Sequence, residues 1–227
     1  MNATGVIAHS TAYDQALNLA CGLLLLTAVG ALWRRQVSAL IPTLVVQGLA
    51  LTVVAVLLAG EHENGREAMA VAIGLGILKA IVIPLLLLRV HRLVPDARET
   101  RPLANVASSM LAAAGLCLLA YAATRPLVEA AGTTTARATP VGLALVLIGF
   151  FLAATRRRSI SQIVALLVID NGIAATAFLA TDGVPLIVEL GVSADLVLAV
   201  LVLQVLSARL VETFGPTDLD DLRELHD

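Results

Sequence analysis

Three ionisable side chains lie inside long apolar segments of this chain, where charge is costly. Lys79 is the only lysine, and it is central in an apolar run over residues 68–88 that has no other ionisable side chain. Asp170 and Asp195 lie near the centres of two other apolar runs. A charged group at membrane depth costs roughly 2.5–3.5 kcal/mol on insertion scales, and such groups mark ion or proton pathways by default. The three residues are therefore predicted as relay groups.

Other polar residues accompany them. Glu189 precedes Asp195 by six residues, which places it about 9 Å nearer the outer surface, as an outer relay group or an interfacial acid. Gln47 and Gln204 lie in other apolar runs, and Asn171 follows Asp170 directly. Amide side chains in membrane helices hydrogen-bond across helices. These three amides are predicted as supporting polar groups.

A structural interpretation competes with the relay. Lys79 is nine or ten residues from either end of its run, roughly 14 Å of helix, so its side chain cannot reach water by stretching. In this interpretation Lys79 forms a buried ion pair with Asp170 or Asp195, and the pair holds the helices in register. One lysine cannot neutralise both acids, however. Pro84 cannot bond the carbonyl of Ala80, so a kink is expected beside the lysine.

The sequence contains no set of residues suited to bind a metal ion or a redox cofactor. Cys21 and Cys117 lie in separate apolar runs, and the four histidines are scattered along the chain. Structural zinc, haem and iron–sulfur sites need clustered Cys or His ligands. The chain is therefore predicted to bind no metal or cofactor and to have no catalytic centre of its own. Nothing indicates a nucleic-acid partner.

Composition places the chain among multi-pass membrane proteins. It is 59% hydrophobic and 14% charged, with a mean hydropathy of +0.92. Apolar runs of about 20 residues, each near the length that crosses the hydrocarbon, follow one another. The predicted fold is all-α with seven transmembrane helices, over residues 14–33, 38–59, 68–89, 104–123, 140–155, 161–180 and 186–208.

Arginine placement predicts the orientation. Arginines gather after the odd-numbered spans, at Arg34, Arg35, Arg89, Arg92, Arg98, Arg101, Arg156, Arg157, Arg158 and Arg209. The opposite connections hold only Arg66, Arg125 and Arg137. Positive residues favour the cytoplasmic side, so the N-terminus is predicted outside and the C-terminus inside, an alternation that seven spans fit and six do not. The run Arg156 to Arg158 is interpreted as a topology signal.

These residues resemble a known pattern. Gln47, Lys79 with Pro84, the run Asp170-Asn171-Gly172, and Glu189 with Asp195 together resemble the hydrogenase-4 component E family of membrane subunits. The chain is predicted to divide into residues 1–103 (helices one to three), 104–210 (helices four to seven) and 211–227 (a short acidic cytoplasmic tail). Residues 140–210 also resemble the K-type subunit of complex I and the C-type subunit of multi-subunit sodium/proton antiporters. Aspartate stands at 170, where the family pattern has glutamate, and this shortens the reach of the carboxylate by one methylene.

The resemblance implies a non-catalytic membrane subunit of a formate-hydrogenlyase-type or complex-I-like oxidoreductase assembly. It would contribute a midplane proton or cation relay through Lys79, Asp170 and Asp195, with Glu189 near the outer mouth. Nickel–iron or iron–sulfur centres are expected only in partner subunits. The implied partners are antiporter-like membrane subunits and a cytoplasmic redox arm, in the inner membrane of a bacterium or archaeon. A stand-alone secondary transporter and a purely structural anchor are the alternatives.

Overall fold

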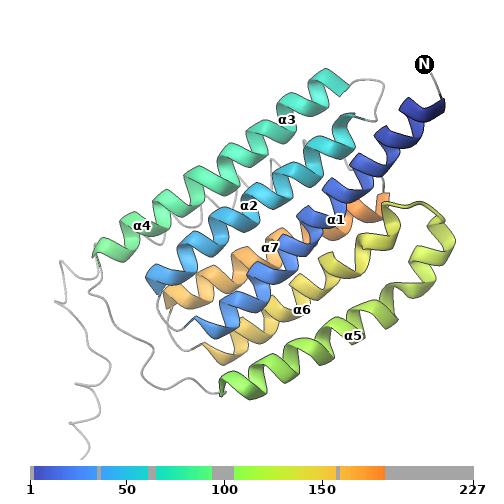
Figure 1. Cartoon of the computed structure of the whole chain (residues 1–227). Helices are drawn as coiled ribbons and strands as arrows, with labels where there is room; N and C mark the ends of the chain where they lie inside the picture. Colours follow the sequence, from blue (N-terminus) through green and yellow to red (C-terminus); the bar gives the residue numbers. More distant parts are fainter. Residues whose placement is uncertain (1–2, 35–36, 61–64, 94–104, 157–158, 182–227) are drawn as a thin grey trace, which may run out of the picture.

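The computed structural model describes residues 3–34, 37–60, 65–93, 105–156 and 159–181. Every regular element in these ranges is helical (Figure 1). In chain order they are α1 (Ala3–Trp33), α2 (Val37–Gly60), α3 (Gly65–Ile77), the π-helical turn η1 (Leu78–Val82), α4 (Ile83–Leu93), α5 (Val106–Ala131), the 3₁₀ turn η2 (Ala136–Ala138), α6 (Thr139–Thr155) and α7 (Ser159–Thr181).

Six helices in the described ranges are long and apolar enough to cross a membrane. They cover Thr11–Trp33, Ala39–Gly60, Gly65–Arg89, Val106–Ala131, Ala136–Thr155 and Ser161–Thr181. The third combines α3, η1 and α4, which form one continuous rod (Figure 1). The seventh predicted span, 186–208, and the tail at 211–227 lie outside the described residues. The count of seven, the orientation and the domain boundaries therefore stay predictions.

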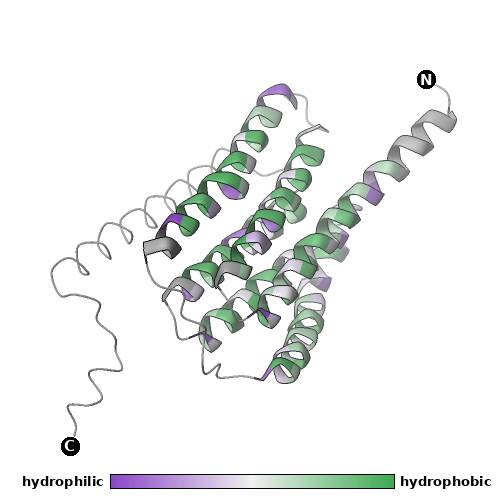
Figure 2. Cartoon of the chain, turned by 60° about the vertical axis from the view of Figure 1, so that its left-hand side comes forward, coloured by the Kyte–Doolittle hydropathy of each residue, from purple (hydrophilic) through white to green (hydrophobic). Residues whose placement is uncertain are grey.

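Two predicted helix boundaries differ from the structure. The first span was predicted from residue 14, but α1 has 31 residues and begins at Ala3. It is roughly 46 Å long at 1.5 Å per residue, longer than the ~30 Å of hydrocarbon. Hydrophobic residues predominate along the helices of the bundle (Figure 2). Hydropathy sets where a helix enters the hydrocarbon, whereas its backbone hydrogen bonds continue beyond that point.

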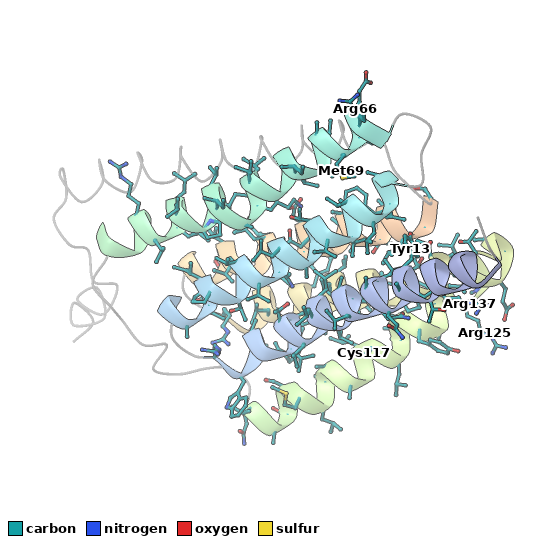
Figure 3. All side chains as sticks on the ribbon, turned by 45° about the horizontal axis from the view of Figure 1, so that its top comes forward. Tyr13, Arg66, Met69, Cys117, Arg125 and Arg137 are labelled. Carbon is teal, nitrogen blue, oxygen red and sulfur yellow. The ribbon has the colours of Figure 1, made fainter. Side chains whose placement is uncertain are left out.

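The fourth span was predicted to end at residue 123, with Arg125 in the connection, and this is wrong. α5 continues to Ala131, and Arg125 Nε donates to Glu129 Oε1 at 2.8 Å on its exposed surface. The residue after α5 is its C-cap Gly132, whose φ of 67° is the left-handed conformation that glycine adopts without strain. Arg66, Arg125 and Arg137, the three arginines predicted on the outer side of the membrane, project from the same end of the bundle (Figure 3).

Glycines allow the closest helix packing in the bundle. α6 and α7 form its most extensive contact. A Cβ added at Gly142 would lie 2.4 Å from Thr176 N, and one at Gly172 would lie 2.6 Å from Val146 N. Small residues at such crossings let helix backbones approach in membranes. α1 packs on α2 and α6, and α2 also packs on α7. Helix α7 therefore contacts both α2, from the N-terminal half of the chain, and α6, which directly precedes it.

The outer faces of the bundle are apolar. α5 lies at its edge (Figure 1) and buries only 17% of its most apolar stretch. Its side chains Leu111 and Leu118 are 77% and 71% exposed. Trp33 is exposed at the end of α1, a place where tryptophan is enriched at membrane interfaces. Exposed leucine over whole helix faces suits a lipid environment.

Arg156 has a structural role that the topology interpretation missed. Its side chain is buried, and Nη2 donates to the carbonyl oxygens of Ala31 and Leu32 at 3.2 and 3.4 Å and of Arg34 at 2.7 Å. The last carbonyls of a helix lack intrahelical donors and carry partial negative charge. The guanidinium of Arg156 satisfies two such carbonyls of α1, at Ala31 and Leu32, and one just after it, at Arg34. These contacts show that α1 and α6 end on the same side of the bundle.

Replacing Arg156 by leucine is expected to lower the free energy of unfolding by about 3 kcal/mol, because the buried carbonyls of α1 lose charge-assisted hydrogen bonds. Unfolding of the purified protein in detergent, followed by circular dichroism, measures the change. Arg137→Leu is the control, since Arg137 is exposed at the opposite end. Equal stabilities of the two variants would contradict this role.

Candidate functional site

A buried ion pair joins the third membrane-spanning rod to α7. Lys79 Nζ donates to Asp170 Oδ2 at 2.7 Å, across 91 residues of sequence. The two side chains are only 2% and 10% exposed. Of the two partners predicted for Lys79, the structure places Asp170 in contact with it. An ammonium and a carboxylate at this distance can exchange a proton, and their contact also ties two helices together.

The lysine lies on a distorted turn of its helix. Ile83 N–H donates to Leu78 O, a bond across five residues in place of four. Pro84, one residue further, has no N–H to restore the regular pattern. The irregularity expected at Pro84 thus takes the form of a π turn, which is rare in helices and frequent at functional sites. Lys79 within this turn is buried, whereas Ile77 and Ile81 on either side of it are exposed.

Gly48 of α2 packs directly on this π turn. A Cβ at Gly48 would lie 2.9 Å from Lys79 C and 3.0 Å from Ala80 N, both backbone atoms. One turn further along α2, Thr52 Oγ1 donates to Gly48 O at 2.7 Å. Gly48 was not among the predicted site residues. Its place beside Gln47, the one amide in the mostly apolar sequence of α2, is the signal that could have indicated it.

The predicted amides Gln47 and Asn171 form a second buried polar contact. Asn171 Nδ2 donates to Gln47 Oε1 at 3.0 Å, and Gln47 is only 1% exposed. Within the described part of the chain, Gln47 Nε2 has no hydrogen-bond partner. One hydrogen bond contributes about 0.5–1.5 kcal/mol net, while a buried unsatisfied N–H costs about 1–3 kcal/mol. The amide pair therefore adds little stability of its own.

The structure brings together four of the predicted site residues: Lys79, Asp170, Gln47 and Asn171. The remaining three, Asp195, Glu189 and Gln204, lie outside the described residues, and their roles stay predictions. Within the described ranges, no group of three or more His, Cys, Asp or Glu is placed to hold a metal. Cys21 is buried in α1, and Cys117 lies about midway along α5 (Figure 3).

The apolar helices, with the ion pair of Lys79 and Asp170 buried among them, define the class as a multi-pass helical membrane protein. The chain belongs to the same family as the uncharacterized protein Rv0085 of Mycobacterium tuberculosis, to which it is 47% identical over 212 residues, 93% of this chain and 96% of that protein.

Hydrogenase-4 component E is a more distant relative. The Escherichia coli protein is 27% identical over 149 residues, 66% of this chain and 69% of that protein. The protein of the same name from Shigella flexneri matches to the same extent. No family model matches the chain, and no solved structure matches it.

Proposed function

We propose that this protein is a non-catalytic membrane subunit of a hydrogenase-4-type or related complex-I-like assembly, in which it contributes a midplane proton or cation relay. The observation that carries the proposal is the buried Lys79–Asp170 pair, because two charges so deep in an apolar bundle are costly to keep for stability alone. The distant likeness to a protein named as a component of hydrogenase-4 supports membership of a multi-subunit complex.

In this proposal Lys79 and Asp170 hold and pass the transported charge, and Asp195 and Glu189 extend the path. Gln47, Asn171 and Gln204 orient these groups. The partners are antiporter-like membrane subunits and a cytoplasmic redox arm, which carries any nickel–iron or iron–sulfur centre. The assembly lies in the cytoplasmic membrane of its cell.

Asp170→Asn is expected to lower ion movement at least tenfold while the complex still assembles. The amide keeps an acceptor oxygen for Lys79 but cannot take up and release a proton. Complexes are recovered from native membranes with a tagged chain, their partners are identified by mass spectrometry, and proton uptake by inverted vesicles is followed with a pH-sensitive dye. Rates are normalised to the assembled complex.

Glu129→Gln is the matched control, because it makes the same chemical change at an exposed position on α5. Normal ion movement in Asp170→Asn would refute the relay. Loss of assembly in that variant alone would favour the structural anchor, whose buried pair only fixes helices. A chain recovered without other proteins, active in liposomes by itself, would favour the stand-alone transporter.

A further inference from the structure

Two consecutive residues of α2 lie against the two helices that carry the ion pair. Gln47 accepts the hydrogen bond of Asn171, the neighbour of Asp170 on α7. Gly48 packs on the backbone of Lys79 and Ala80 in the π turn. One short segment of α2 thus contacts both the π turn of Lys79 and the residue next to Asp170.

Stability alone does not explain an amide at this position. Leucine is close in size to glutamine and would fill the same buried space. It would remove the Nε2 group that has no partner among the described residues, but it would leave the buried Asn171 Nδ2 without its acceptor. Apolar residues at both positions would leave neither group unsatisfied. Gln47 is among the largest fully buried side chains of the described residues, and all the other side chains in that set are apolar. A single directional contact in such a setting specifies rotation and register, which apolar packing specifies less sharply.

We infer that Gln47 is a positioning residue, whose amide holds α7 at the rotation that brings the Asp170 carboxylate to Lys79. The positioning of the ion pair by Gln47 does not depend on the proposed function. Only the purpose of that positioning, ion movement through the pair, rests on it. Among the described helices, those packed on α7 add no competing charge nearby: α2 and α6 contain no titratable residue, and Arg137 of η2 is exposed at the bundle end. The titratable side chains of α5 lie on exposed or half-buried positions, at Cys117, Tyr121, Arg125 and Glu129.

The sequence offers a direct measurement of the contact. Lys79 is the only lysine, so ¹⁵N-lysine labelling yields a single ammonium signal in solid-state NMR of the full chain in lipid bilayers. With ¹³C-labelled aspartate, dephasing of this signal reports the distance from Nζ to the nearest carboxylate, and Asp170→Asn identifies the contribution of Asp170.

Gln47→Leu is expected to lose at least half of this dephasing. The exchanged pair Gln47→Asn with Asn171→Gln keeps the summed side-chain length and the amide contact, so it should restore the dephasing that Gln47→Asn alone reduces. Gln15→Leu, the same substitution on the exposed face of α1, is the control and should keep the full signal.

Full dephasing in Gln47→Leu or in Gln47→Asn would overturn the inference. So would an exchanged pair that folds but does not recover the contact. Should Gln47→Leu not accumulate in membranes, the comparison of Gln47→Asn with the exchanged pair decides. The measurement is independent of ion movement: a failed relay in the Asp170→Asn vesicle assay would leave it standing, and a failed NMR test would leave the relay standing.

Discussion

Lys79→Met is expected to lower the free energy of unfolding by about 3–5 kcal/mol, the usual cost of removing one member of a buried ion pair. Methionine fills much of the lysine volume, so packing changes little. The loss arises because the buried Asp170 carboxyl group, whose side chain is only 10% exposed, loses the donor that lies 2.7 Å away. Reversible unfolding in mixed detergent micelles, followed by circular dichroism, gives the change.

The double variant Lys79→Met with Asp170→Leu provides the control. When both charges are removed, neither is left uncompensated, so most of the lost stability should return. Ion movement should remain absent in the double variant, since nothing is left to carry a proton. A double variant less stable than Lys79→Met would show that the pair itself supplies the stability, and the argument from desolvation would be wrong.

Gly48→Ala is expected to lower the free energy of unfolding by about 1–3 kcal/mol, the usual cost of overpacking. The added methyl group would lie 2.9–3.0 Å from backbone atoms of Lys79 and Ala80. Backbone atoms cannot rotate away as the end of a flexible side chain does, so α2 and η1 must separate. The same displacement should move Lys79 from Asp170, which the single ¹⁵N-lysine signal measures.

Gly115→Ala is the matched control for this change. Gly115 lies inside α5, and nothing lies within 4 Å of a Cβ built there. Alanine is the better helix former by about 1 kcal/mol, so this variant should be unchanged or slightly more stable. Equal effects at the two glycines would mean that the close approach of α2 to the π turn is unimportant.

The sequence was informative wherever hydropathy and charge act alone. The membrane-spanning helices follow from apolar length, and a deeply buried lysine requires an acid, which made Asp170 one of two candidates for its partner. The contact of Asp170 with Lys79 depends on the rotation of α7, and Asp195 lies outside the described residues. The role of Arg156 and that of Gly48 depend on which helices are neighbours, and the far end of α5 depends on local hydrogen bonds beyond the apolar run. Hydropathy indicates neither which helices are neighbours nor where such local hydrogen bonds form.

The π turn also affects the outer surface of its rod. Ile73, Ile77, Ile81 and Leu85 recur every four residues and are 50%, 50%, 51% and 59% exposed. In an uninterrupted α-helix each such step advances about 40° beyond a full turn, so Leu85 would point about 120° away from Ile73. The wider turn at Leu78–Val82 rotates back part of this drift. One apolar ridge thus continues along the outside of the rod, while the ammonium group is kept on the inside.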